Sequence, residues 1–487
     1  MNHAGRSIAD QALLDIREAL GDAPIHNLLL LVGKGHNGGD AIIAARHLLN
    51  RFPDAKVKMV FPSGLSHLRL LAHKSLDAFQ VSHGEQLKYL SLRQGSKDGV
   101  EAQIQSFLGS ESIDLCLDGI LGMQFKPPLR SPIKELIECV NALESIQCRI
   151  AVDVPSGVGD NSDETRFRAD FSYATGIAKR GMFELQNRPA VGRIRYLDLG
   201  FFRPSNLYAK ISVLSDGALG FRKALRKSQV HKKKFGHVFV LGGSAAMPGA
   251  ILMTVRAAVK SGVGLVTAFV PNSIVAEAAS QIPEAMWCGL PEIPEDGGLA
   301  LEGLSQIREL ADKATAWAIG PGMGRNPETA TLIEEVLRLS RSPVLLDADA
   351  LLPELVKMDW SNRACAITPH NGEFNRLLDR PLNDPVGIHD LRNFSHEFSC
   401  IALLKGSPTA IVVEDRVVYS CFGSPVLARG GSGDILAGLI GGRLAIPGAN
   451  SVESVLQGAA WHGWSADRLA RTQGQTSAKA TDVLDFL

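Results

Sequence analysis

The chain has 487 residues, of which 45% are hydrophobic and 21% charged, a length and composition that favour two to four globular domains and exclude disorder. Basic and acidic residues both number 51, which argues against a protein that binds nucleic acid. The seven scattered cysteines and the lack of an apolar run of about 18 residues exclude a disulfide framework and a membrane span, and they favour the cytoplasm.

Short apolar runs alternate with amphipathic segments in the first part of the chain. Buried strands are predicted at 27–32, 56–61, 113–117 and 149–152. Helices are predicted between them, for example at 41–50 and 132–143. This alternation is typical of a parallel sheet covered by helices on both faces.

Polar residues follow three of these strands. The first strand runs into a glycine-rich turn at 33–40, where the backbone can approach a ligand and the next helix favours an anion. Asn37, Asp118 and Ser156 could together offer oxygen ligands to one cation, K⁺ or Mg²⁺ rather than zinc. The alternative is that each Asp only caps a helix or forms a turn.

The same alternation recurs in the second part of the chain. Strands are predicted at 237–241, 264–270, 314–319, 344–346, 364–367 and 401–404. Helices are predicted at 251–261 and 435–444. The boundary is placed between about 202 and 234, giving domains 1–210 and 211–487. A basic run at 222–234 is interpreted as a solvated linker, with a polyanion patch or a nucleotide entrance as alternatives.

The segment 429–438 carries the most chemical information. Its glycines present backbone N–H groups to an anion, and the helix that follows points its positive end at the same place. The helix dipole is expected to keep Asp434 ionised as a base, whereas the alternative is a simple helix cap. Glycine- or Asp-bearing turns also follow other strands of this part, at 242–244, 320–324, 347–350, 368–373 and 405–409. A shared crevice at one end of the sheet is therefore predicted. For His370, a structural role stays as open as a functional one.

In the first part, NGGD at 37–40, D-x-x-x-G at 118–122, DVPSG at 153–157 and KRG at 179–181 together resemble the NAD(P)H-hydrate epimerases. The resemblance implies a Rossmann-like three-layer α/β/α domain, K⁺ held by Asn37, Asp118 and Ser156, and Asp153 as the catalytic acid/base. The hydrated nucleotide would contact His36, Asn37, Gly38, Gly39, Asp40, Gly122, Met123, Gln124, Phe125, Lys126, Pro127, Pro128 and Asp153. The family usually has Asn at the position of His36 and GTG at 122–124, so a first domain that is only a scaffold stays an alternative.

In the second part, GGS…MPGA, GPGMG, DADAL, TPHNGE, KGSPT and GGSGD resemble, over 230–487, the ADP-dependent NAD(P)H-hydrate dehydratases of the ribokinase-like superfamily. The resemblance implies a ribokinase-like three-layer α/β/α domain with Asp434 as the catalytic base. The hydrated nucleotide would contact Ala250, Gly322, Gly324, His370 and Asp434. ADP would contact Lys405, Gly406, Ser407, Pro408, Thr409 and Gly433. Ser432, Asn371 and Pro408 depart from the usual pattern, and Pro408 removes one backbone donor near the nucleotide.

The two resemblances together imply a bifunctional repair enzyme. It would dehydrate the S form of NADHX or NADPHX with ADP and Mg²⁺, releasing NAD(P)H, AMP and phosphate, and would interconvert the R and S hydrates in a K⁺-dependent domain. A homo-oligomer with no nucleic-acid or membrane partner is expected. The alternatives are a small-molecule kinase of the same superfamily and a regulatory protein that binds nucleotides without turnover. The fused first domain and TPHNGE favour the repair enzyme over the kinase.

Overall fold

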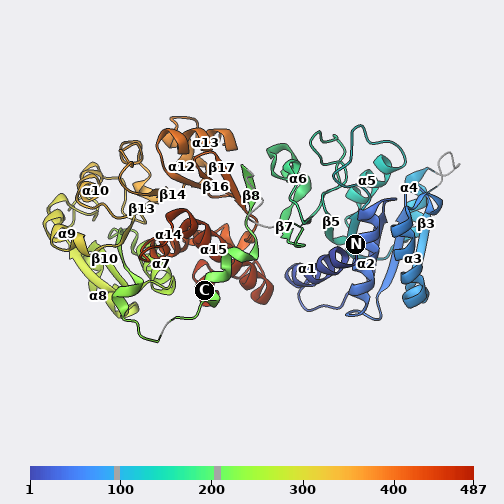
Figure 1. The fold of residues 1–487 in the computed structure, drawn as a ribbon, viewed down its shortest axis with the longest axis horizontal. Coiled ribbons are helices and arrows are strands. Elements are labelled where there is room, and N and C mark those ends of the chain that lie inside the picture. Colours follow the sequence, from blue (N-terminus) through green and yellow to red (C-terminus); the bar gives the residue numbers. More distant parts are fainter. Residues whose placement is uncertain (93–98, 202–209, 227) are drawn as a thin grey trace. The chain divides into compact units, whose positions relative to one another are not determined.

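The computed structural model describes residues 1–92, 99–201, 210–226 and 228–487. The chain divides into two compact units, Met1–Tyr208 and Ala209–Leu487 (Figure 1). Part of the expected boundary and Lys227 of the basic run lie outside the described residues. Within the described ranges, no helix combines the length and the apolar character needed to cross a lipid bilayer.

The first unit is built on a parallel sheet. Its strands are β1 (Asn27–Val32), β2 (Lys56–Phe61), β3 (Leu87–Ser91), β4 (Ile113–Gly119), β5 (Ile146–Val152), β6 (Phe171–Thr175) and β7 (Arg193–Leu197). Its α-helices are α1 (Asn2–Leu20), α2 (His36–Leu49), α3 (Leu70–His83), α4 (Val100–Leu108), α5 (Ile133–Ala142) and α6 (Arg188–Val191). The strand order is β3-β2-β1-β4-β5-β6-β7, so the chain reverses its direction of travel across the sheet between β1 and β4.

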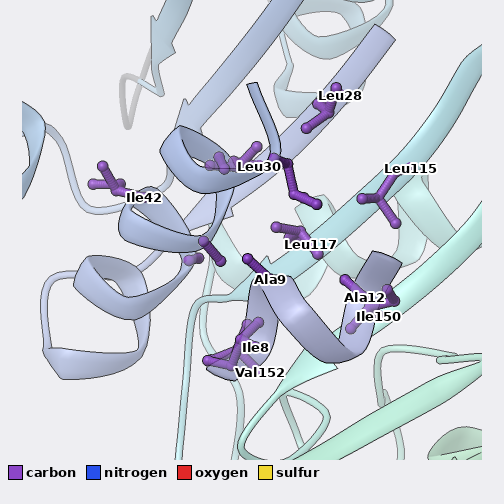
Figure 2. Close-up of a cluster of buried hydrophobic side chains, with 14 of the residues drawn as sticks. Ile8, Ala9, Ala12, Leu28, Leu30, Ile42, Leu115, Leu117, Ile150 and Val152 are labelled. Carbon is purple, nitrogen blue, oxygen red and sulfur yellow. The ribbon is translucent and has the colours of Figure 1, made fainter. Parts of the chain in front are cut away.

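Alternate residues of β1 pack on opposite faces of this sheet. Leu28 and Leu30 point into the core formed with α1, α2 and α3, part of which Figure 2 shows. Leu29 and Leu31 point into the core formed with α4 and α5. Because side chains alternate along a strand, this all-apolar sequence lies between two helical layers. The unit is therefore a three-layer α/β/α domain, as predicted.

Strands β6 and β7 were missed because polar residues interrupt their apolar pattern, Ser172 in β6 and Arg193 and Arg195 in β7. Arg195 of β7 is only 5% exposed and forms an ion pair with Asp15 of α1, with a distance of 2.9 Å between Nη2 and Oδ1. Arg193 pairs with Glu18 of the same helix. The partners lie far apart in sequence, so the apolar pattern carried no sign of them. The edge strand β3 was also missed, and α2 begins at His36 rather than at residue 41.

The second unit is built on a larger sheet. Its strands are β8 (Ile211–Val213), β9 (His237–Leu241), β10 (Leu265–Pro271), β11 (Met286–Leu290), β12 (Ala316–Ile319), β13 (Val344–Leu346), β14 (Cys365–Ile367), β15 (Ile401–Leu404), β16 (Thr409–Val413) and β17 (Arg416–Ser420). Its α-helices are α7 (Pro248–Lys260), α8 (Val275–Gln281), α9 (Leu304–Leu310), α10 (Pro327–Leu339), α11 (Pro353–Val356), α12 (Asn371–Leu377), α13 (Ile388–Glu397), α14 (Ser432–Leu444) and α15 (Ser451–Gln473). The order is β11-β10-β9-β12-β13-β14-β15-β16-β17-β8, with β16 antiparallel to both of its neighbours.

Helices α7, α14 and α15 contribute to one core of this sheet, while Phe239, Phe269 and Trp317 form an aromatic cluster. Helix α14 packs closely on α7, since a Cβ added at Gly438 would lie 2.0 Å from the carbonyl oxygen of Thr254. Farther along, Gly442 faces Ser261. The two helices therefore run parallel, and both begin at the same end of the sheet.

The interpretation of the basic run as a solvated linker is wrong for Arg222. Its guanidinium lies 4.0 Å from the ring centroid of Trp464 in α15, where aromatic stacking outweighs full hydration. Just before it in the chain, β8 pairs with β17 at the edge of the sheet. This segment is thus part of the second unit.

Two candidate active sites

The first candidate site lies where β1 and β4 end side by side. A Cβ at Gly33 would lie 1.8 Å from the carbonyl oxygen of Ile120, so only glycine lets the turn after β1 touch the turn after β4. Asn37 follows in the first turn of α2. Its Nδ2 donates to the carbonyl oxygens of Leu121 at 2.9 Å and Val152 at 3.1 Å. The end of the sheet where strand order reverses is where ligands bind in such folds.

Asp118 and Ser156 meet beside Asn37. Asp118 is fully buried, and its carboxylate accepts from the hydroxyl and the backbone N–H of Ser156, each at 2.7 Å. The Ser156 hydroxyl in turn accepts from the N–H of Leu121 at 3.0 Å. Burial raises the pKa of Asp118 to about 6, against the lowering effect of these hydrogen bonds. The structure thus brings the three predicted cation ligands together.

Asp153 lies at the end of β5 in a left-handed backbone conformation, with φ of 74°. Its Oδ1 accepts from the Thr175 hydroxyl at 2.6 Å and forms an ion pair with Lys179. A non-glycine residue held in this conformation is a feature of functional sites. Neither Thr175 nor Lys179 has a role predicted from the sequence. The KRG motif contained the lysine, whereas Thr175 ends the missed strand β6.

Asp40 is the second buried carboxylate near this position. Burial raises its pKa to about 7, the N-terminal amine lowers it, and the charge of Asp153 raises it further. Its Oδ1 is buried without a hydrogen-bond partner among the described residues. The site therefore holds one carboxylate paired with a lysine and one that is protonated for much of the neutral range.

The other predicted contacts of the first site lie in α2 and in the turn after β4. His36, Gly38 and Gly39 belong to the first turn of α2. Gly122 lies against Asn37, since a Cβ added there would be 2.6 Å from Nδ2. Of the remaining residues of the turn, Phe125 is half-buried and packs against the core formed with α4 and α5. The others are exposed: Met123, Gln124, Lys126, Pro127 and Pro128. One end of this turn thus contacts Asn37, and most of its side chains are open to solvent.

The second candidate site lies at the corresponding reversal between β9 and β12. Gly322 has φ of 68°, and a Cβ added to it would lie 2.8 Å from Cβ of Ala250 and 2.8 Å from the carbonyl oxygen of Met247. The turn after β12 therefore touches the start of α7. Gly324 donates its N–H to Asp349 at 3.0 Å. Of the predicted hydrate contacts, Ala250 and Gly322 are in direct proximity.

Lys405, which follows β15, contacts carboxylates that follow the neighbouring strands β13 and β14. Its Nζ lies 3.0 Å from Oδ1 of Asp347 and 3.4 Å from Oε2 of Glu373, and a Cβ added at Gly433 would be 3.3 Å from it. Burial acts to lower the pKa of Lys405, but the two carboxylates outweigh it and the pKa is raised. Two predicted ADP contacts, Lys405 and Gly433, thus lie together. The remaining ones, at 406–409, form the turn between β15 and β16.

Asp434 occupies the third position of α14. The helix begins after Gly431, which has φ of 94°, so Asp434 is not its N-cap. Burial raises the pKa of Asp434 to about 6, Asp347 raises it further and Lys405 lowers it. Burial and the neighbouring carboxylates thus oppose the ionisation of Asp434 that is expected from the helix dipole. A carboxylate with this pKa is still ionised for the most part near neutral pH.

His370 has a clear structural role as the N-cap of α12. Its Nδ1 accepts from the N–H groups of Gly372 at 3.0 Å and Glu373 at 3.2 Å, while the ring remains 58% exposed. Asp347, Asp349 and Glu373 were not assigned as site residues, although all three stand in turns that follow β13 or β14. Their position after a strand was the available signal.

Both units match family models. Residues 238–487 match a model described as NAD(P)H-hydrate dehydratase, and residues 1–181 match one described as YjeF-related protein N-terminus. The ribokinase-like superfamily protein from Enterococcus faecalis V583 has a TM-score of 0.50 and 24% identity, over 57% of this chain and 94% of that chain. The ADP/ATP-dependent NAD(P)H-hydrate dehydratase from Bacillus subtilis, crystallised with ATP and Mg²⁺, is 27% identical over 54% of this chain and 91% of that chain, with a TM-score of 0.47.

A full-length relative matches the two units together. The bifunctional NAD(P)H-hydrate repair enzyme Nnr of Moorella thermoacetica is 32% identical over 488 aligned positions, which cover 97% of this chain and 88% of that protein. The order of the two matched families along the chain agrees with this relative's description as bifunctional. The chain therefore belongs to the family of bifunctional NAD(P)H-hydrate repair enzymes.

Proposed function

We propose that the second predicted domain, residues 211–487, uses ADP to dehydrate the S form of NAD(P)H hydrate. The observation that carries this proposal is the position of Asp434 at the start of α14. There the charges of Lys405, Asp347 and Glu373 shift the pKa of its carboxylate. A half-buried carboxylate with a pKa of about 6 is a suitable base at neutral pH. Membership of the family supports the same assignment over a kinase or a binder without turnover.

The chemistry follows from the proposed residues. Asp434 takes the proton of the hydrate's hydroxyl, whose oxygen attacks the terminal phosphorus of ADP and displaces AMP. The C–O bond then breaks, phosphate leaves and the adjacent ring carbon loses a proton to solvent, which restores the double bond of the dihydronicotinamide. Phosphorylation helps because hydroxide is a poor leaving group. Lys405, Gly433 and the turn at 406–409 bind the ADP, and the N–H groups at the start of α14 stabilise charge on the phosphoryl group.

The surroundings of Asp434 fit a Mg²⁺ ion that arrives with the nucleotide. No group of three or more His, Cys, Asp or Glu side chains is arranged to hold a metal in the part of the chain that the structure describes. Such a site suits Mg²⁺, which keeps several waters and binds through substrate phosphates. When bound, the ion neutralises phosphate charge. Asp347 and Asp349 are the protein carboxylates we propose to hold its water shell.

The first predicted domain, residues 1–210, interconverts the R and S hydrates. We assign Asp153 as its acid/base, because its carboxylate is held by Thr175 and Lys179 in a strained conformation beside Asp40. The hydrated nucleotide contacts the start of α2 and the turn at 122–128. His36 and the residues at 122–124 depart from the usual family pattern, so the rate of this unit has to be measured separately.

The residues around Asp118 fit a K⁺ ion. Its buried carboxylate receives hydrogen bonds from the neutral groups of Ser156 and Ile120. The Asn37 amide faces two carbonyl oxygens, and with its oxygen and nitrogen exchanged it would complete an oxygen-lined site. Carbonyl, hydroxyl and carboxylate oxygens are the ligands of alkali ions. The proposed ligands are thus Asn37, Asp118 and Ser156, and the ion would supply positive charge beside an anionic substrate.

The assay for both activities is a mixture of R and S hydrates incubated with the protein, ADP and Mg²⁺. Recovery of dihydronicotinamide absorbance is followed after subtraction of uncatalysed epimerisation. Both epimers disappear if both units are active, and only the S form disappears quickly if the first unit is a scaffold. No recovery of either form rejects the dehydratase assignment. The expected cytoplasmic location and homo-oligomeric state stay predictions from the sequence.

A further inference from the structure

Glu373, the last residue of TPHNGE, contacts two groups that the proposed function assigns to different ligands. It is buried, with 7% exposure, in the first turn of α12. Its Oε2 accepts from the backbone N–H of His370 at 2.7 Å and lies 3.4 Å from Nζ of Lys405. Its Oε1 lies 3.5 Å from Nε2 of His370. One carboxylate therefore lies against both His370, which is proposed to contact the hydrate, and Lys405, which is proposed to contact ADP.

The contacts of His370 determine which ring nitrogen carries the proton. Because Nδ1 accepts two backbone hydrogen bonds from Gly372 and Glu373, a neutral ring must carry its proton on Nε2. That N–H faces the Glu373 carboxylate. The N–H groups at the start of α12 thus fix the tautomer of the ring, and the Glu373 carboxylate lies beside its Nε2.

Lys405 is held from two directions. Asp347, at the end of β13, is itself oriented by a 2.9 Å hydrogen bond from the Thr368 hydroxyl and contacts Lys405 through Oδ1. Glu373 contacts the same ammonium from α12. Two fixed carboxylates restrict a long, flexible side chain more than one does, and they place its charge beside Gly433.

We infer that Glu373 is a positioning residue of the dehydration reaction, which holds Lys405 at the nucleotide and His370 at the hydrate through a single carboxylate. The inference rests on the proposed function, which assigns Lys405 to ADP and His370 to the hydrate. A helix cap alone explains the hydrogen bond from the His370 N–H, but it does not explain the contact with Lys405. The two roles can be separated because the cap needs only an oxygen acceptor, whereas the electrostatic attraction that holds the Lys405 ammonium depends on the negative charge.

The test is Glu373→Gln, which keeps the acceptor for the cap and removes the charge. In calorimetric titrations without divalent cations, we expect ADP to bind at least about threefold more tightly, because a negative charge beside Lys405 is lost. With Mg²⁺ present, we expect kcat for recovery of NADH to fall at least about tenfold, because Lys405 and His370 lose a shared anchor. Tighter binding with slower turnover is a combination that loss of a cap does not produce.

The matched control is Asp390→Asn. The Asp390 carboxylate accepts from the Gly387 N–H at 3.0 Å at the start of α13, and it pairs with Arg380 at 3.0 Å. This variant therefore changes one capping carboxylate with a cationic partner, as Glu373→Gln does, but its partner is not a residue of the site. We expect its ADP affinity and kcat to equal those of the native protein.

ADP affinity that is unchanged or weaker in Glu373→Gln would overturn the inference, and it would leave Glu373 as a cap or as a contact of the metal. The same holds if Asp390→Asn gives an equal gain in affinity. A native protein that binds no ADP and recovers no NADH rejects the proposed function together with this inference. A native protein that does both, with a glutamine variant that behaves like it, rejects only the role of Glu373.

Discussion

Replacement of Asp434 by Asn is expected to abolish dehydration and, at the same time, to stabilise the protein. The carboxylate is the proposed base, so kcat should fall by about 10²–10⁴-fold. Stability should rise because the carboxylate is held at a pKa of about 6 against an ordinary value of 3.8. At about 1.4 kcal/mol for each pKa unit, the folded protein loses about 3 kcal/mol by keeping this group ionised. Asparagine has nearly the same shape and carries no such cost.

The sign of the pH dependence follows from the same values. The pKa of Asp434 is higher in the folded than in the unfolded chain, so the folded state binds the extra proton and loses stability as the pH rises from about 4 through about 6. The gain of Asp434→Asn should therefore be about 3 kcal/mol near pH 7.5 and about half of that near pH 5. The activity of the native protein should fall about tenfold from its plateau by pH 5, because about one carboxylate in ten is then ionised.

The measurement is the melting temperature of the transition that ADP raises, recorded for both proteins at the two pH values. A gain of about 3 kcal/mol corresponds to about 6–12 °C for a domain of this size. Asp390→Asn is the control, because that carboxylate accepts from Gly387, pairs with Arg380 and is not among the charges that act on Asp434, so its removal should not stabilise. A gain for Asp434→Asn that is absent, or equal at the two pH values, would refute the electrostatic reasoning. Retained activity would refute the role as base.

Other substitutions test the remaining parts of both sites. Gly322→Ala should raise KM for the hydrate and cost about 1–3 kcal/mol, because its methyl group would lie 2.8 Å from Ala250 at a positive φ; unchanged kinetics and melting would contradict this. Asp153→Asn should stop consumption of the R hydrate and leave that of the S hydrate intact, and equal loss of both would disprove a separate epimerase. K⁺ should raise the melting temperature of the native protein above about pH 6, where Asp118 is ionised, and Asp118→Asn should remove this effect; a rise that persists in the variant would place the ion elsewhere.

The sequence predicted those strands and helices that are specified by the residues of their own segment. The run Asn27–Val32 is entirely apolar after its first residue, as a strand buried on both faces requires, and it is β1. Strand β7 was missed because Arg193 and Arg195 occupy positions that a pattern search reserves for apolar residues. Their charges are compensated by acidic residues of α1, which lies at the other end of the first unit's sequence. Such compensation is a property of the fold and leaves no periodic signal.

The same distinction applies to the sites. Polar residues directly after strands could be assigned to one end of each sheet, and Asn37, Asp118 and Ser156 do meet there. The partner of Lys405 could not be assigned in this way, because several carboxylates follow neighbouring strands. The length and the burial of each side chain determine which carboxylate pairs with Lys405, and both effects depend on the packed structure.

Asp118 and Asp434 illustrate why a perturbed pKa does not by itself reveal a role. Burial raises both to about 6, yet their surroundings differ. Asp118 has no exposure and accepts three hydrogen bonds, which fits the proposed cation ligand better than a base that must contact the substrate. Asp434 is partly exposed at the start of a helix, with Lys405 and further carboxylates around it. Its charge can be relieved by a proton from a bound ligand, and this access distinguishes a base from a cation ligand with the same pKa.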